Sequence, residues 1–466
     1  MDDDNGLGWP STIRRLNIRI TLGQSEPHPD LASRAPREPQ DAPFTHPETP
    51  PIPAPSAGAM QASDDADSVP RSRWMTLLPD STPLSALTIP GTHDSAARIS
   101  LPFVQTQTLS ITDQLATMGV RALDLRLRRD PSEGDKLYCY HGGVPLGPPL
   151  GRRLPLDEIM AEIWRFLGDV GTDRPGAVKD SSATADGRRS GETVLVLINN
   201  DDTSDGRDPA GRAAFYHAVE DFVAATPPWQ DGGADEAAKG NGQGRADSRS
   251  GVSTPRWYTE ARTPTLGEVR GRAVLLRRFP LPDPAGGVSP AEPLGLDLSA
   301  WVNDSPDFTI ISPHNRFRVQ DKWLYPKRVP LEELIASKSA HVRYMIEQAA
   351  AESRRSRSRR LLRESGEGTG AHQDDDDLWY INFCSAVGER LKYGEVADPK
   401  SVAAGAFVGW GRKWLDGVNA LTAEYVTSTL PALDKQASRA LGIIYMDFPE
   451  LPVGNSLVGQ LIQNNF

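Results

Sequence analysis

Cysteine is scarce in this 466-residue sequence, and a long apolar run is missing. The two cysteines, Cys139 and Cys384, are too few for a disulfide framework, and both lie in apolar runs, which is typical of buried free thiols. No stretch approaches the roughly 18 apolar residues of a transmembrane helix, and the start, MDDDNGLGWPSTIRR, has no apolar signal core. We therefore expect neither a membrane span nor a secretory signal.

An excess of positive charge is also missing, since 51 Lys and Arg residues face 62 Asp and Glu residues and the formal net charge is −11. A general nucleic-acid binder needs a basic face toward the phosphate backbone, so we expect no nucleic-acid partner. Hydrophobic residues make up 38% of the chain, alongside 41 glycines and 40 prolines. This composition predicts a globular protein with long irregular interruptions.

The irregular interruptions divide the chain. Residues 1–22 contain one possible strand at 12–22, and the Pro-rich residues 23–70 are interpreted as a disordered linker. Residues 71–466 are expected to form one large domain. Three stretches within it lack hydrophobic periodicity and are interpreted as insertions in surface loops: 177–191, 230–255 and 353–377.

Short apolar or alternating runs predict eight strands, at 86–90, 121–126, 136–141, 193–199, 273–278, 316–321, 379–383 and 442–447. Apolar residues at helical spacing predict helices at 156–167, 215–225 and 331–350. Strands that alternate with helices imply a parallel sheet, and eight of them favour an α/β fold, a distorted TIM-type (β/α)8 barrel. The gap at 127–135 is too short for a helix, which is irregular for such a barrel.

Polar side chains gather where the predicted strands end, which is the active-site face of a parallel barrel. The strand-end residues are His93, Asp94, Arg126, His141, Asn199, Asp201, Arg278, Asp321 and Asp447. Two histidines can act as general base and acid near neutral pH, and an arginine can bind two phosphate oxygens at once. The set suits cleavage of a phosphodiester that carries a neighbouring hydroxyl group.

A series of motifs makes this interpretation specific. In chain order they are IPGTHDS at 89–95, RALDLR at 121–126, YHGG at 140–143, ETVLVLIN at 192–199, TLGEVRGRAVLLRRF at 265–279, VQDKW at 319–323 and YMDF at 445–448. The series resembles that of the bacterial-type phosphatidylinositol-specific phospholipases C, and it covers most of residues 74–450. The resemblance implies the barrel of the phospholipase C-like phosphodiesterases.

The resemblance also implies roles for the strand-end residues. His93 is similar to the general base that removes the inositol 2-hydroxyl proton, with Asp447 holding its imidazole. His141 resembles the general acid, supported by Asp94. Arg126 resembles the arginine that stands where calcium-dependent relatives bind their ion, so we expect no metal and no cofactor. Taken alone, Asp124 could simply pair with Arg121 or Arg126.

The implied headgroup pocket matches less well. Arg278 and Asp321 match family positions that bind inositol hydroxyls, and Trp323 stands where a tyrosine packs on the ring. Asn199 replaces a family lysine, and Asp201 replaces a glutamate. The expected function is cleavage of phosphatidylinositol to diacylglycerol and a cyclic inositol phosphate. The alternatives are a different phospholipid or glycosyl-phosphatidylinositol headgroup, or a barrel that binds lipid without catalysis.

The remaining expectations concern partners and location. The arginine-rich run at 353–363 suits anionic lipid, a nuclear-targeting signal or a solvated loop. Trp410 and Trp414 could reach a membrane interface, but we expect them to pack in the core. The substrate implies peripheral contact with a membrane surface, and the missing signal favours an intracellular location. Four histidines are expected to be solvated: His217, His314, His341 and His372. The sequence does not indicate an oligomeric state.

Overall fold

A computed structural model describes most of the predicted domain. The described residues are 69–168, 190–202, 208–230, 253–282, 294–326, 329–364, 378–388, 397–408, 413–433, 440–453 and 456–466. The possible strand at 12–22, nearly all of the linker at 23–70 and most of the insertions at 177–191 and 230–255 lie outside these residues. Val69–Phe466 forms one compact unit.

All eight predicted strands are present. They are β1 (Thr88–Thr92), β2 (Ala122–Asp130), β3 (Lys136–His141), β6 (Val194–Asn200), β10 (Ala273–Arg277), β13 (Arg316–Gln320), β15 (Leu378–Phe383) and β19 (Gly442–Met446). Seven of them pair in parallel, in the order β10, β6, β2, β1, β19, β15, β13. The central residues of β6, β10 and β19 are apolar and buried, as in sheets covered on both faces.

The eighth strand, β3, departs from the prediction because it does not belong to the parallel series. It pairs antiparallel with the second half of β2, Leu127 facing Cys139. An antiparallel pair needs only a tight turn, which explains the short gap at 127–135. Two short strands extend the sheet at its ends: β11 (Leu296–Asp297) parallel to β10, and β12 (Phe308–Ile311) antiparallel to β13. Within the described residues β11 and β12 do not pair, so the barrel is open there.

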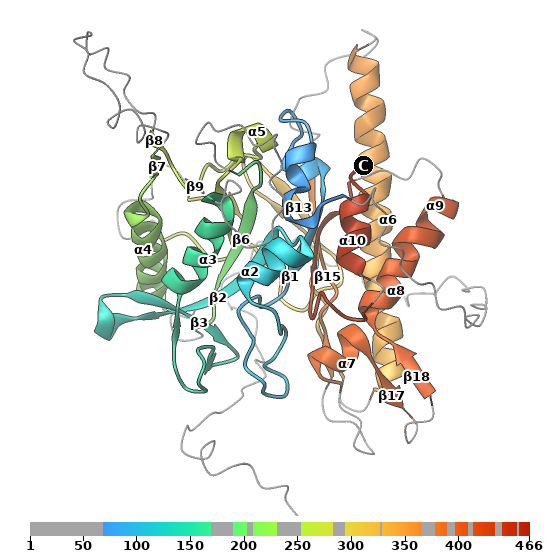
Figure 1. Cartoon of the computed structure of the whole chain (residues 1–466), viewed down its shortest axis with the longest axis horizontal. Coiled ribbons are helices and arrows are strands. Elements are labelled where there is room, and N and C mark those ends of the chain that lie inside the picture. The colour runs from blue at the N-terminus through green and yellow to red at the C-terminus, as the bar shows by residue number, and fades with distance from the viewer. Residues whose placement is uncertain are drawn as a thin grey trace, which may run out of the picture. The chain divides into compact units, whose positions relative to one another are not determined.

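Helices lie around the sheet (Figure 1). The main ones are α3 (Leu156–Gly168), α4 (Pro209–Ala225), α6 (Leu331–Glu364), α8 (Val418–Glu424) and α10 (Leu457–Gln463). α6 packs against β13 and β15, and α10 packs against β1. The three predicted helices are confirmed, although α4 begins six residues earlier than expected and α6 continues well beyond residue 350. The expected α/β fold, a distorted TIM-type barrel, is confirmed.

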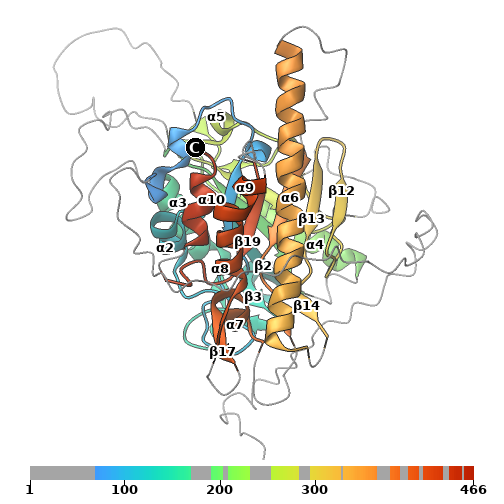
Figure 2. The ribbon, with the colours of Figure 1, turned by 90° about the vertical axis from the view of Figure 1, so that its right-hand side faces the viewer.

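The extension of α6 corrects the prediction of a surface-loop insertion at 353–377. Residues 353–364 continue the helix, while residues 365–377, with His372, lie outside the described residues. No residue from 351 to 359 is buried. Arg355 and Arg359 both pair with Glu352, at 3.1 and 2.8 Å, as neighbours one and two turns apart on a helix do. Figure 2 shows this end of α6 projecting past the sheet.

The two ends of the barrel differ in character. At the end where β2 begins, the guanidinium of Arg121 is fully buried and lies 2.7 Å from the carboxylate of Glu192. Glu192 also accepts hydrogen bonds from Thr76, at 2.7 Å from its backbone and 2.6 Å from its hydroxyl. This buried network closes the base of the barrel, while the polar strand-end residues lie at the opposite end. In the part of the chain that the structure describes, we find no helix long and apolar enough to span a bilayer.

Candidate active site

The loop after β1 places two of the predicted catalytic residues. Gly91 within β1 is required by packing, because a Cβ atom there would lie 2.7 Å from the Tyr445 ring of the neighbouring strand β19. The His93 backbone N–H donates to the carbonyl of Met446 at 3.0 Å, which ties the loop to the end of β19. Asp94 has φ = 41°, a left-handed conformation that non-glycine residues seldom adopt outside functional or tight turns.

His93 has a defined partner at each ring nitrogen. Its Nδ1 lies 2.9 Å from Oδ1 of Asp447 at the end of β19. Its Nε2 lies 3.2 Å from Oδ2 of Asp94 and 3.0 Å from the guanidinium of Arg126. Nε2 donates to Asp94 when it carries a proton and accepts from Arg126 when it does not. The two contacts therefore match the two protonation states that a general base requires.

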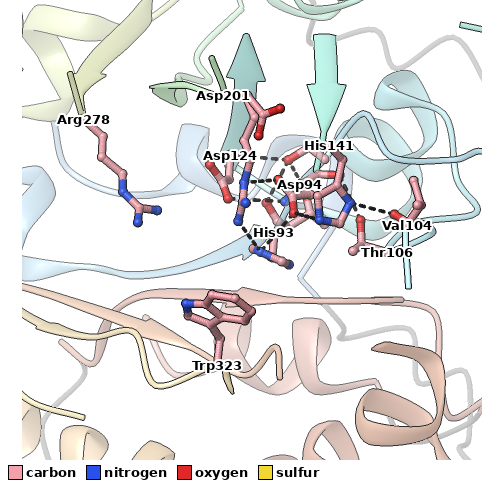
Figure 3. Close-up of polar contacts among 12 residues, drawn as sticks. His93, Asp94, Val104, Thr106, Asp124, His141, Asp201, Arg278 and Trp323 are labelled. Carbon is pink, nitrogen blue, oxygen red and sulfur yellow. Dashed lines mark hydrogen bonds and ion pairs between the residues drawn. The ribbon is translucent and has the colours of Figure 1, made fainter. Parts of the chain in front are cut away.

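His141 reaches the same carboxylate from the β2–β3 hairpin. Its Nε2 lies 3.1 Å from Oδ2 of Asp94, and its Nδ1 lies 2.8 Å from the carbonyl oxygen of Val104. A carbonyl only accepts, so Nδ1 carries a hydrogen and donates it. The rings of His93 and His141 are 6.4 Å apart between centroids and nearly perpendicular. Figure 3 shows both rings turned toward Asp94.

Asp94 is thus the shared centre of the cluster. Besides the two histidines, it lies 2.5 Å from Nε of Arg126. Burial disfavours its charge, but Arg126 and the histidines outweigh this and lower the pKa of Asp94 to about 2. Burial would likewise lower the pKa of His93, yet Asp94 and Asp447 raise it to about 9. The cluster holds an ionised carboxylate against a histidine that favours its protonated form.

Asp124, for which the sequence suggested only an ion pair with Arg121 or Arg126, contacts the backbone of this cluster. Its carboxylate accepts the backbone N–H of Asp94 at 3.3 Å, whereas Arg121 pairs with Glu192 instead. Burial and the neighbouring Asp94 raise the pKa of Asp124. Oxygen and nitrogen atoms of His93, Asp94 and Asp124 lie within 4.8 Å of one another, a possible metal-ligand set. The Arg126 guanidinium contacts two of those three residues, so an ion would compete with an existing cation there.

The predicted headgroup residues on β10 and β13 come together. Arg278 lies 3.2 Å from Asp321, and its guanidinium stacks 3.9 Å above the ring centroid of Trp301. The Trp301 indole N–H donates to Asp321 at 2.7 Å. In the view of Figure 3, Trp323 lies below Arg278 and His93. The sequence did not indicate Trp301, because it follows β11, a two-residue strand that leaves no periodic pattern.

The two residues that depart from the family pattern lie on the other side of the site. Asn199 is paired in register with Arg126 on β2. The Asp201 carboxylate lies 3.2 Å from Arg128 and accepts the backbone N–H of Gly143 at 3.3 Å. Asp201 therefore connects the end of β6 to the loop that follows His141.

Two sequence expectations near the site are wrong. Trp414 is not in the core: it is 46% exposed on a hairpin formed by β17 (Gly405–Val408) and β18 (Lys413–Asp416), beside Phe407, which is 65% exposed. Trp410 lies outside the described residues. His341 is only partly exposed and has a partner: it lies 3.1 Å from the Tyr325 hydroxyl, and burial lowers its pKa to about 4. His217 and His314 are exposed, as expected.

Comparisons with known proteins agree with this geometry at the level of the fold. No family model matches the chain. A 1-phosphatidylinositol phosphodiesterase of Listeria monocytogenes is 25% identical over 217 residues, which cover 45% of this chain and only about half, 50%, of that protein. A structure of Staphylococcus aureus phosphatidylinositol-specific phospholipase C, 18% identical, superposes with a TM-score of 0.50 and covers 86% of this chain and 100% of that one. The L. monocytogenes phospholipase C structure is 20% identical, with a TM-score of 0.47 and coverage of 85% and 100%. The chain has the fold of the bacterial-type phosphatidylinositol-specific phospholipases C.

Proposed function

We propose that this protein is a phospholipase C-type phosphodiesterase that cleaves phosphatidylinositol to diacylglycerol and a cyclic inositol phosphate. The observation that carries the proposal is the bridge of Asp94 between His93 and His141, with Arg126 on the same carboxylate. A base, an acid and a fixed cation around one point are the parts that intramolecular attack on a phosphodiester needs.

The proposed reaction moves one proton at each histidine. Neutral His93 takes the proton of the inositol 2-hydroxyl at Nε2 while that oxygen forms a bond to phosphorus. The bond from phosphorus to the glycerol oxygen breaks, and His141 gives that oxygen its Nε2 proton. Asp447 orients His93 through Nδ1, and Val104 orients His141 in the same way. Attack by the neighbouring hydroxyl leaves a cyclic phosphate.

Arg126 supports a reaction without a metal ion. Its guanidinium lies among the His93, Asp94 and Asp124 donor atoms, where an ion would otherwise bind. A planar, permanently charged guanidinium can neutralise two phosphate oxygens in the transition state. We therefore assign charge stabilisation to Arg126.

The substrate implies contact with a membrane surface, and the exposed hairpin β17–β18 supports such contact. Its aromatic residues Phe407 and Trp414 are exposed and lie 5.0 Å apart between ring centroids. The hairpin directly follows α7 (Pro399–Ala404), whose first residues line a shallow cavity together with the loop after β1 and Phe448. Its lining includes Phe103 and Gln105, the residues on either side of Val104, whose carbonyl orients His141.

Product analysis tests this proposal. Incubation with phosphatidylinositol vesicles, followed by ³¹P NMR, should give a cyclic inositol phosphate and diacylglycerol, and His93→Ala and His141→Ala should each abolish the product. A linear inositol phosphate as the first product, or full activity in either variant, would contradict the assigned mechanism. No turnover of any phosphodiester would instead favour a lipid-binding barrel without catalysis.

A second candidate is cleavage of a phospholipid with a different headgroup, or of a glycosyl-phosphatidylinositol anchor. It is favoured by Asp201, whose carboxylate already binds Arg128 and Gly143, and by the neutral Asn199 beside Arg126. A panel of phosphatidylinositol, phosphatidylcholine, sphingomyelin and a glycosyl-phosphatidylinositol anchor separates the two candidates by their relative kcat/KM.

A further inference from the structure

Lys338, on the third turn of α6, is a charged residue buried in the protein interior. Its side chain has no exposed surface. Its ammonium group donates to Oε1 of Gln320 at 3.0 Å and to the backbone carbonyl of Lys322 at 2.6 Å. Among the described residues, no carboxylate lies within ion-pair distance of this ammonium. A buried cation without a counter-ion costs stability, so its hydrogen bonds are the clearest reason for its position.

Both acceptors belong to the segment that ends β13 and carries Asp321 and Trp323. Oε1 of Gln320 also accepts the backbone N–H of Lys322 at 2.7 Å. Lys338 therefore binds the segment on both sides of Asp321, once through a side chain and once through the main chain. Figure 2 shows α6 running alongside β13 and β14 (Leu324–Tyr325), the two strands that flank this segment.

The same network extends to the catalytic histidine. The side-chain amide of Gln320 donates to Asn382 at 2.7 Å and to the carbonyl of Phe383 at 2.8 Å. The Phe383 ring packs edge-on against His93, with centroids 5.9 Å apart. Lys338 thus contacts a hydrogen-bonded network that extends to Phe383, whose ring packs against the proposed base His93.

The exposed side of the segment has its own attachment. Asp304 accepts the backbone N–H groups of Trp323 and Leu324 at 3.0 and 2.9 Å, and it pairs with the Lys322 ammonium at 2.7 Å. Asp321 in turn is bonded to Arg278 and Trp301. Residues 321–324 are therefore fixed from the interior by Lys338 and from the surface by Asp304.

We infer that Lys338 is a positioning residue that fixes the segment 321–324, and with it Asp321 and Trp323, in the geometry that receives the substrate headgroup. The inference rests on the proposed function where it identifies the bound headgroup as that of the substrate. The fixing of the segment by Lys338 does not depend on that function. Lys338 acts through Asp321 and Trp323 and does not itself touch the reacting atoms.

Lys338→Met, made in the full chain, tests the inference. The variant keeps the aliphatic stem and removes the three donors, and it should fold because it removes a buried ion. We expect amide hydrogen exchange at Lys322, Trp323 and Leu324 to become roughly tenfold faster, since these amides belong to the loosened segment. With phosphatidylinositol we expect KM to rise about tenfold while kcat changes less than about threefold, the pattern of lost binding geometry.

Two further variants make the result interpretable. Glu192→Gln weakens a buried ion pair at the opposite end of the barrel, so it should lower stability without changing exchange at 321–324 or KM. Asp304→Ala loosens the same segment from its exposed side and should reproduce the rise in KM even if Lys338→Met does not fold.

The outcomes separate the inference from the proposed function. Unchanged exchange in Lys338→Met, faster exchange with an unchanged KM, or a change equal to that of Glu192→Gln would each overturn the positioning role. If the wild-type protein cleaves no phosphatidylinositol, the proposed substrate is wrong, and the exchange measurement still decides whether Lys338 fixes the segment.

Discussion

Replacement of Asp94 by asparagine should change the pH dependence of catalysis as well as its rate. The substitution keeps the shape of the side chain but removes the negative charge shared by His93, His141 and Arg126. The charge of Asp94 raises the pKa of His93, as do the charge and the hydrogen bond of Asp447. The amide should therefore return His93 toward its ordinary proton affinity.

The size of the effect follows from the pKa of His93. The rise from 6.5 to about 9 corresponds to about 3 kcal/mol in favour of the imidazolium, at about 1.4 kcal/mol for each tenfold change in proton affinity. In the wild type only about 1% of His93 is then neutral at pH 7, so kcat/KM for a substrate whose leaving group needs no acid should rise with pH until about 9. If Asp94→Asn removes half of that preference, the neutral fraction at pH 7 increases roughly fifteenfold.

Asp94→Asn should therefore have two opposing effects on kcat/KM. Loss of the shared carboxylate should cost roughly 10²–10⁴ in kcat/KM through poorer orientation of both histidines and Arg126. At pH 7 the larger neutral fraction of His93 offsets part of that loss, whereas at pH 9 it does not. We expect the ratio of wild-type to variant kcat/KM to be about ten times larger at pH 9 than at pH 6.5.

The assay is kcat/KM for a soluble nitrophenyl inositol phosphodiester, whose leaving group needs no acid, between pH 5.5 and 10, with an NMR titration of the histidines. Asp201→Asn is the matched control, because Asp201 contacts neither catalytic histidine. A loss for Asp94→Asn that is the same at every pH would refute the reasoning, since it would mean that Asp94 does not set the protonation of His93.

Three more predictions concern the roles of His141 and Arg126 and the buried ion pair of Arg121 with Glu192. His141→Ala should lower kcat/KM about 10³-fold for an alkyl phosphodiester but only about tenfold for a nitrophenyl ester, whose leaving group needs no acid. Equal losses of kcat/KM for the two substrates would contradict the role of His141 as the acid. Cleavage should be unchanged in EDTA, and loss of activity restored by calcium would overturn the role of Arg126. Glu192→Gln should lower the free energy of unfolding by about 3 kcal/mol or more in urea titration with an unchanged KM, because it leaves the Arg121 charge buried without its ion-pair partner.

The free energy of unfolding should also depend on pH through the raised pKa of His93. A group whose pKa is raised on folding contributes stability below its unfolded pKa, and this contribution is lost as pH rises through the folded pKa. For His93 that window runs from 6.5 to about 9. The wild-type protein should become less stable across it, and Asp94→Asn should show a smaller decline.

Much of the barrel could be predicted from the sequence because its strands are short buried runs with a polar residue at the end. Such runs as VLVLIN in β6 leave a strong local pattern, and all eight predicted strands are present. The parallel placement of β3 was wrong because pairing direction depends on the turn and not on the strand itself. The helical extension of α6 was missed because arginine and serine residues read as a solvated loop when no buried face accompanies them.

The candidate site was predictable only in part, because tertiary contacts leave no local pattern in the sequence. Motif order placed His93, His141, Asp94, Arg126 and Asp447 together, and the structure brings all five into one cluster. Which carboxylate bridges the two histidines depends on tertiary contacts, as do the positions of Trp301 and Lys338. A buried lysine within a helical pattern has no local mark that distinguishes it from an exposed one.

The position of β3 separates the proposed acid from the proposed base. His93 directly follows β1, which pairs with β19 and β2, whereas His141 ends a hairpin strand that branches from β2. Within the described residues, that strand otherwise pairs only with β4 (Val144–Pro145) and β5 (Leu154–Pro155). Changes in that branch should move His141 without disturbing the parallel ladder. The proposed base and the proposed acid thus stand on separate structural parts, so the position of His141 can be altered while that of His93 stays fixed.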